Sequence, residues 1–178
     1  PPTPARTRRP TDDESERLTH TLGYSRETPP ETISSRVGAA YLFAIETGMR
    51  AGEICSLEWR YVNERHVHLP RTKNGHVRDV PLSVEARRII EQLRSLTGDE
   101  ETVFGVSTAS LDALFRKAKR LALIEDLHFH DTRREALTRL SKVFDVMELA
   151  RISGHRDLRV LQNVYYAPSV KDLADKLG

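Results

Sequence analysis

The stretch RVGAAYLFAIETG, residues 36–48, predicts the main apolar helix of this 178-residue chain. Ser34 or Ser35 can cap its start, because a hydroxyl oxygen there accepts a hydrogen bond from a free backbone N–H group. Gly48 is placed to end it, since glycine readily takes the left-handed conformation that stops a helix. A helix this apolar has to be covered by other elements.

Helical periodicity and capping signals on both sides of this segment predict a mainly helical fold. The period changes to two between Val62 and Leu82, where Asn74-Gly75 separates two alternating segments and indicates a β-hairpin. The fold class is therefore mainly α (α+β), with one small antiparallel β-sheet. The other predicted helices cover residues 12–22, 50–59, 83–96, 108–122, 131–142, 146–152, 158–166 and 170–177.

Length and composition limit the classes of protein to which the chain can belong. The length suits one substantial domain and a short arm. Residues 1–10, PPTPARTRRP, are predicted to be that arm or a linker, and the start at Pro1 suggests a piece of a longer protein. The single cysteine, Cys55, excludes an internal disulfide framework and fits a reducing, cytoplasmic compartment. No apolar run approaches the ~20 residues that cross a bilayer, so no membrane partner is expected.

Arg50, Glu53 and Lys73 are the first candidates for chemistry. Arg50 opens a helix, where the helix dipole disfavours a cation, so another group has to hold it. Glu53 lies on the same helix face and is placed to do so. Lys73 lies at the tip of the predicted hairpin, from which a proton donor can reach a substrate. An ordinary surface role is the alternative for each.

The second half of the chain adds two histidines, an arginine and two tyrosines. His130-x-x-Arg133 at a helix start aims two side chains at one point, where free N–H groups favour an anion. His155 follows a glycine in ISGHRD. Tyr165 and Tyr166 follow in LQNVYYAPSV, where packing is the ordinary role of an aromatic residue.

Taken together, these residues supply the groups that phosphodiester cleavage without a metal requires. Arginines neutralise the non-bridging oxygens, histidines hold or move protons, and a lysine protonates the departing oxygen. A tyrosine nucleophile gives a covalent phosphoryl-enzyme. No metal or other cofactor is expected, since His128, beside His130, has no Glu or Cys at ligand spacing.

Five segments, in this order, resemble the tyrosine recombinase (phage integrase) family: ETGMRAGEICSLEW, RTKNGHVRDVPL, HFHDTRREA, ISGHRDL and VYYAPSVKDL. The resemblance covers residues 11–178, which correspond to the family's catalytic domain. It implies site-specific recombination or integration of DNA, through a 3′-phosphotyrosine link and a Holliday junction, without metal or nucleotide. The family's N-terminal core-binding domain is missing, so residues 1–10 would be the linker that follows it.

The resemblance also implies a role for each candidate. The catalytic residues would be Arg50, Lys73, His130, Arg133, His155 and a tyrosine, with Glu53 as the acid that supports Arg50. Lys73 would be the general acid for the leaving 5′-oxygen. Tyr165 aligns with the family's nucleophile. The family more often places this tyrosine nine residues after the second histidine, whereas Tyr165 is at ten and Tyr166 at eleven. Tyr165 is therefore preferred, with Tyr166 as the alternative.

Double-stranded DNA and other recombinase protomers are the partners that the resemblance implies. The protomers would form a tetrameric synapse on DNA and be monomers or weak oligomers without it. The last helix would pack on a neighbouring protomer or fold back on its own domain. The basic surface of helix 108–122 can cross a duplex or be a solvated face. Its DNA-binding candidates are Arg116, Lys117, Lys119 and Arg120.

Two other functions fit parts of the same sequence. A helix-turn-helix DNA-binding module around residues 145–166 would bind DNA without a covalent adduct. It leaves Arg50, Lys73 and Tyr165 without roles. A DNA-relaxing enzyme similar to type IB topoisomerases uses similar residues, but the small size and the Gly-His at 154–155 favour a recombinase.

Overall fold

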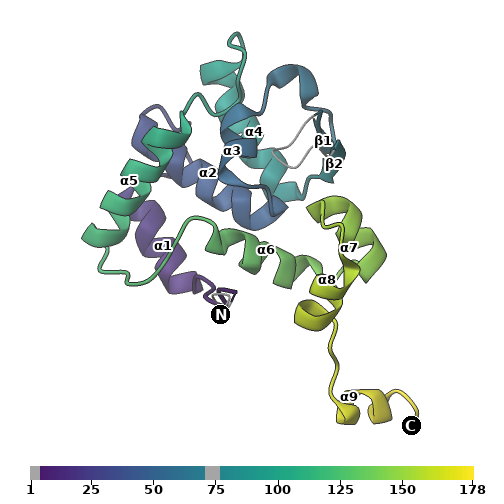
Figure 1. Ribbon diagram of the computed structural model, residues 1–178. Helices are drawn as coiled ribbons and strands as arrows, with labels where there is room; N and C mark the ends of the chain where they lie inside the picture. The colour runs from purple at the N-terminus through teal and green to yellow at the C-terminus, as the bar shows by residue number, and fades with distance from the viewer. Residues whose placement is uncertain (1–4, 71–76) are drawn as a thin grey trace.

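The computed structural model describes residues 5–70 and 77–178, and helices dominate it (Figure 1). Its elements are α1 (Asp12–Thr21), α2 (Ile33–Thr47), α3 (Ala51–Ser56), η1 (Trp59–Tyr61), β1 (His66–Leu69), β2 (Arg78–Pro81), α4 (Val84–Thr97), α5 (Thr108–Leu121), α6 (Asp131–Leu140), α7 (Val146–Ser153), α8 (Leu158–Tyr165) and α9 (Val170–Asp175). The predicted fold class, mainly α with one small antiparallel sheet, is confirmed.

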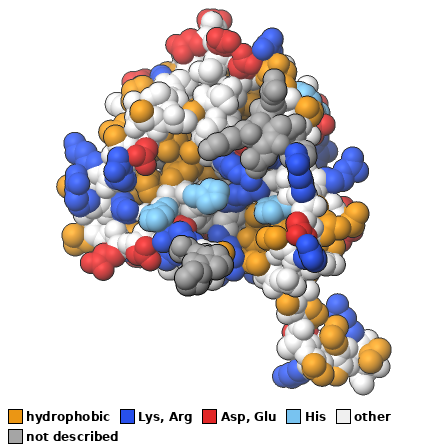
Figure 2. Space-filling model, viewed as in Figure 1, with side chains coloured by type: hydrophobic (Ala, Val, Ile, Leu, Met, Phe, Trp, Pro, Cys, Tyr) orange, Lys and Arg blue, Asp and Glu red, His pale blue; other side chains and the backbone are white. Residues whose placement is uncertain are grey.

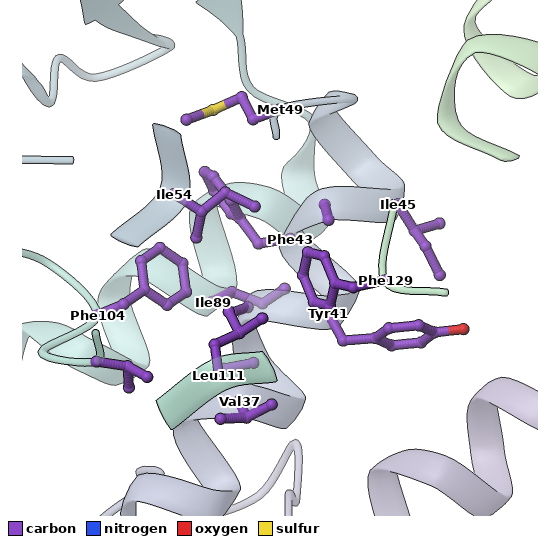
Figure 3. Packing of buried hydrophobic residues seen from close by; sticks show 14 of the residues in the cluster. Val37, Tyr41, Phe43, Ile45, Met49, Ile54, Ile89, Phe104, Leu111 and Phe129 are labelled. Carbon is purple, nitrogen blue, oxygen red and sulfur yellow. The ribbon is translucent and has the colours of Figure 1, made fainter. Parts of the chain in front are cut away.

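Helix α2 is the centre of the hydrophobic core. Its N-cap is Thr32, whose hydroxyl accepts a hydrogen bond from the Ser35 N–H group at 3.0 Å, so the helix begins slightly earlier than predicted. It ends at Gly48, with φ at 73°. Helices α1, α3, α4, α5 and α6 all pack on α2. Figure 3 shows Phe43 and Phe104 within this core, with ring centres 5.2 Å apart.

The two strands form the predicted hairpin. They pair antiparallel, with Val67 opposite Val80 and Leu69 opposite Arg78. Both valines are fully buried, so one face of the hairpin belongs to the core. The predicted turn at Asn74-Gly75 lies outside the described residues.

Helix α3 ends at Ser56, earlier than the predicted end at residue 59. Leu57 is extended, and its carbonyl accepts a hydrogen bond from the Val103 N–H group at 2.9 Å. The Trp59 N–H group donates to the Glu101 carbonyl at 3.0 Å. Pairing with this distant segment satisfies the backbone and ends the helix, which local sequence signals do not reveal.

The predicted arm contacts the domain through ion pairs. Arg6 donates two hydrogen bonds to the carboxylate of Asp131, at 3.0 and 2.9 Å. Arg8 donates to Glu14 at 2.8 Å. Residues 5–10 therefore lie against the start of α6 and of α1.

The C-terminal part of the chain is less closely packed on the core. Leu137, Leu149 and Leu161 form a small separate cluster between α6, α7 and α8. Helix α9 has no buried residue and projects away from the rest of the molecule (Figure 1). Among the described residues, no helix is long and apolar enough to cross a membrane.

Candidate active site

Arg133, in the first turn of α6, connects three separate segments. Its side chain is buried, and its Nη1 donates to the Gly48 carbonyl at 2.6 Å. Its Nη2 donates to the Ser153 carbonyl, also at 2.6 Å. Gly48 stands just before Arg50, and Ser153 stands just before the loop that holds His155. One guanidinium group therefore holds together the segments that carry Arg50 and His155.

Arg78, in β2, is a site residue that the sequence reasoning missed. Its buried guanidinium donates to the Ile152 carbonyl at 2.9 Å and to both carboxylate oxygens of Glu53, at 2.5 and 2.9 Å. Gly154 has φ at 76°, and a Cβ atom there would lie 3.3 Å from Arg78 Cδ, so glycine leaves room for this arginine. Strand alternation places Arg78 on the same face as the buried Val80, and this signal could have found it.

Glu53 bonds mainly to Arg78 rather than to Arg50. The backbone N–H group of Arg50 donates to Glu53 Oε1 at 2.9 Å, but Arg50 Nη1 lies 3.9 Å from that oxygen. Burial opposes ionisation of Glu53, yet the hydrogen bonds from Arg78 and Arg50 keep its pKa below the ordinary value. The Arg50 guanidinium is 32% exposed, and its contact with Glu53 is a long ion pair without a hydrogen bond, which leaves its N–H groups available for a ligand.

Both histidines are kept neutral by their surroundings. His130 precedes the first turn of α6, and His155 follows the end of α7. Burial lowers the pKa of both, and the positive charges of Arg133 and Arg50 lower it further, to about 4 for His155. His155 Nδ1 lies 2.7 Å from the hydroxyl oxygen of Ser153. Neutral imidazoles can accept or pass a proton at neutral pH.

The two tyrosines have different surroundings. Tyr165, half-buried at the end of α8, has its ring centre 5.3 Å from the guanidinium carbon of Arg134. Burial raises the pKa of Tyr165, while the charges of Arg134 and Arg133 oppose that rise. The Tyr166 hydroxyl donates to the Phe144 carbonyl at 2.6 Å. The structure gives the Tyr165 hydroxyl no hydrogen bond to a described residue.

The remaining predicted residues are Lys73 and the basic residues of α5. Lys73 lies outside the described residues, in the connection that leads to Arg78. The basic residues of α5 form a separate group: Arg116, Lys117, Lys119 and Arg120. Lys119 Nζ donates to the Leu127 carbonyl at 2.9 Å and so contributes to packing, while the other three are exposed. Figure 2 shows Lys and Arg atoms over α5, and His atoms in a row across the middle of this face.

The arrangement has the charge of an anion site. Arg50, Arg78 and Arg133 lie around one carboxylate, Glu53, so the site carries an excess of positive charge. Burial and the neighbouring cations lower the pKa of Arg133 to about 9, which leaves it protonated at neutral pH. Within residues 5–70 and 77–178, no three His, Cys, Asp or Glu side chains are grouped as metal ligands would be. The excess of positive charge around Glu53 makes this a candidate site for a phosphate or a similar anion.

A profile of the phage integrase family matches residues 8–171. The chain therefore belongs to the phage integrase family. It is 56% identical over 149 residues to a Haemophilus influenzae protein assigned as an integrase/recombinase, covering 83% of this chain and 49% of that protein. It is also 45% identical over 124 residues to the shufflon-specific DNA recombinase of Escherichia coli, covering 67% of this chain and 32% of that protein.

The fold is also similar to solved structures. A lambda integrase dimer bound to a COC′ core site matches with a TM-score of 0.72 at 17% identity, covering 92% of this chain and 49% of that one. This likeness shows the helical fold described above. The chain spans about half the length of the curated relatives that it matches first, 49% and 48%.

Proposed function

We propose that this chain is the catalytic domain of a tyrosine-type site-specific DNA recombinase. Membership of the phage integrase family supports strand breaking and rejoining. The names of the relatives, one of them a shufflon-specific DNA recombinase, support DNA rearrangement as the outcome. Residues 11–178 would be the catalytic domain, and residues 1–10 the linker from a core-binding domain. Because the substrate is DNA, we expect the protein to act in the cytoplasm of a bacterial cell.

The observation that carries this proposal is the pair of hydrogen bonds made by Arg133. They join the turn before Arg50 to the end of α7 before His155, and Arg133 itself follows His130 by one helical turn. An ionised Tyr165 would act on the same guanidinium. Candidates that are far apart in sequence are thereby held within electrostatic reach of one another.

The chemistry assigned to these groups balances as a transesterification. The Tyr165 oxygen attacks phosphorus and the P–O5′ bond breaks, which leaves a 3′-phosphotyrosine and a free 5′-hydroxyl. Lys73 gives its proton to the departing oxygen, and a neutral histidine such as His130 accepts the proton of the phenol. Arg50 and Arg133 stabilise the negative charge that grows on the non-bridging oxygens. Attack by another strand's 5′-hydroxyl reverses these steps and releases the tyrosine.

Tyr165 is the better candidate for the nucleophile. Its hydroxyl group is not engaged by a described residue, and two arginines of α6 lie near its ring or within reach of its charge. The Tyr166 hydroxyl is held by the Phe144 carbonyl, a bond that attack on phosphorus would break. These contacts support the choice that the family alignment suggested.

Other protomers are proposed as partners, through α9. Val170 and Leu177 are 82% and 90% exposed, and Leu173 is 48% exposed. Figure 2 shows hydrophobic atoms on the C-terminal segment, which stands clear of the rest of the molecule. Packing on a neighbouring protomer in a tetrameric synapse would cover them. Removing residues 170–178 should leave thermal unfolding unchanged and reduce strand exchange between duplexes.

The proposal is tested with a nicked duplex that carries the source element's own junction sequence. The protein is mixed with it in EDTA and denatured, and covalent protein–DNA bands are counted for wild type, Tyr165→Phe and Tyr166→Phe. We expect an adduct that is lost only in Tyr165→Phe. Loss only in Tyr166→Phe would move the nucleophile by one residue.

Binding without an adduct would point to a DNA-binding module. If DNA were still bound without an adduct after the chain was joined to the N-terminal half of its Haemophilus influenzae relative, the recombinase assignment would be wrong. Adding a second duplex with a free 5′-hydroxyl separates recombination from simple relaxation, because only a recombinase is expected to transfer the strand between sites.

A further inference from the structure

Arg134 and Tyr165 form a contact that the proposed chemistry does not use. Arg134 directly follows Arg133 on α6, so the two side chains leave the helix in different directions. The guanidinium carbon of Arg134 lies 5.3 Å from the centre of the Tyr165 ring, a distance typical of a cation over an aromatic face. With the residues that the structure describes, the Arg134 guanidinium makes no ion pair and no hydrogen bond. The tyrosine ring is therefore its partner.

The same contact lines a pocket of about 370 Å³ beside the tyrosine. Arg134 and Tyr165 form one part of its wall, with Thr138 and Lys142 from the same side of the molecule and Arg9 from the arm. Arg9 lies 3.8 Å from the carboxylate of Glu135, so part of its charge is compensated.

Several charged groups thus surround the Tyr165 phenol. Arg133 and Arg134 approach it from α6, and Arg9 approaches from the arm. Lys142 lies in the same pocket, and Glu135 pairs with Arg9. Of the positive charges, that of Arg134 has the largest effect in lowering the pKa of the phenol, against the rise that burial causes. Loss of this arginine would therefore raise the pKa of the Tyr165 phenol.

We propose that Arg134 is a positioning residue for the nucleophile: its guanidinium holds the Tyr165 ring by its face, in the orientation from which the phenol oxygen attacks phosphorus. The proposal rests on the proposed role of Tyr165. Arg133 would act on the phosphate, and Arg134, the next residue, on the attacking group. A planar guanidinium suits this task better than an ammonium group, because it can stack on a ring. If Arg134 were only a solvated surface residue, replacing it would not change the reactivity of Tyr165.

The first test measures the rate of adduct formation against pH, with Arg134→Gln, Arg134→Lys and Arg134→Ala. Arg139→Gln is the matched control, since Arg139 lies on the same helix but pairs with Glu135 and Asp12. We expect Arg134→Gln to lose about 3- to 30-fold in rate, the range of a cation–π contact. The pH profile of Arg134→Gln should shift toward higher pH. The rate and pH profile of Arg134→Lys should lie between those of Arg134→Gln and wild type. The control Arg139→Gln should match wild type.

Chemical rescue gives a sharper readout from the same variants. Millimolar guanidinium should restore adduct formation in Arg134→Ala, because the vacated position adjoins an existing pocket. It should not help Tyr165→Phe. If the Arg134 variants keep the wild-type rate and pH profile while Tyr165→Phe forms no adduct, the recombinase assignment stands and the role of Arg134 is refuted.

A second measurement does not depend on activity. Tyrosines are replaced by 3-fluorotyrosine, and the ¹⁹F signal of residue 165, identified by its loss in Tyr165→Phe, is titrated. In Arg134→Gln this phenol should titrate at higher pH than in the parent protein, and in Arg139→Gln at the same pH. Equal titration in all three proteins would overturn the proposal even if no adduct formed.

Discussion

At the scale of single residues, Tyr165 and Tyr166 differ in what their hydroxyl groups contact. The sequence could not separate them firmly, because both are aromatic and both lie close to the expected spacing from His155. The structure adds that Tyr166 donates to a backbone carbonyl, while Tyr165 lies against an arginine. Such contacts depend on how α8 packs on α6, which no local pattern encodes.

Tyr166→Phe should lower stability and leave cleavage intact. The change removes the hydrogen bond to the Phe144 carbonyl, which predicts a loss of about 0.5–1.5 kcal/mol in the free energy of unfolding. Tyr165→Phe should show the reverse pattern, with stability kept and cleavage lost. Urea unfolding and adduct formation on the same preparations check both. If Tyr165→Phe and Tyr166→Phe had the same free energy of unfolding, the proposed difference between the two hydroxyl groups would be refuted.

Arg78 shows which kind of site residue the sequence reasoning overlooked. The antiparallel pairing of the two strands was predicted correctly, but Arg78 was not considered as a site residue. Alternation with Val80 placed it on the buried face. Arg133 joins the segments that carry Arg50 and His155, and the roles of these residues stay proposals.

At the scale of elements, β2 and α3 are joined by the buried ion pair between Arg78 and Glu53. Glu53→Ala would leave Arg78 as an unpaired buried charge, so we expect a loss of roughly 3–5 kcal/mol in the free energy of unfolding. Adding Arg78→Met should recover part of that loss. Glu91→Ala, which removes an exposed pair with Arg94, is the control and should change little. If Glu53→Ala and Glu91→Ala lowered the free energy of unfolding by the same amount, the stabilising role of the buried ion pair between Arg78 and Glu53 would be contradicted.

Helix α5 is predicted to meet DNA through its exposed cations. Lys117→Gln and Arg120→Gln should each lower the slope of log K against log salt by about 0.9 if each contacts one phosphate. Lys119→Gln should instead reduce stability, because its ammonium group is bonded to the Leu127 carbonyl. Binding measured across a salt series, beside thermal unfolding, separates the two outcomes. Unchanged slopes in the first two variants would remove α5 from the DNA surface.

Element boundaries were predicted closely where capping residues mark them and poorly where tertiary contacts decide. The helices predicted to begin at residues 12, 108 and 146 do begin there, and Thr11, Ser107 and Asp145 cap them. The predicted end of α3 was wrong because Leu57 and Trp59, predicted to be helical, pair instead with the segment near Val103. Local signals carry no information about such a partner.

At the scale of the whole molecule, stability should fall in acid in two stages. His155 has its folded pKa lowered to about 4 from 6.5, so the unfolded chain binds the extra proton and stability declines as pH falls through that window. Glu53 and Glu14 have their pKa lowered by arginines, that of Glu14 to about 2, so their contribution is lost below about pH 4.5.

Urea unfolding at a series of pH values checks this behaviour. His155→Asn should flatten the curve between about pH 6.5 and 4 and leave the decline at lower pH in place. A wild-type curve that is flat from pH 7 to 5, or that rises toward acid, would contradict the assignment of a neutral His155.

The placement of the arm could not be read from the sequence. Arg6 and Asp131 are 125 residues apart in the sequence, and PPTPARTRRP reads as a flexible segment by composition. Charge complementarity fixes it against the helix that carries Arg133. Arg6 and Arg9 therefore lie against the same helix that carries Arg133 and Arg134, two of the proposed site residues.

The most direct test of the central claim is to identify the residue that becomes joined to DNA. The adduct is digested with nuclease and trypsin, and the peptide of residues 160–171, which contains both tyrosines, is fragmented in a mass spectrometer. We expect a nucleotide attached through its 3′-phosphate to Tyr165. A 3′-phosphate on Tyr166, a 5′-linked nucleotide, or a modification outside this peptide would contradict it.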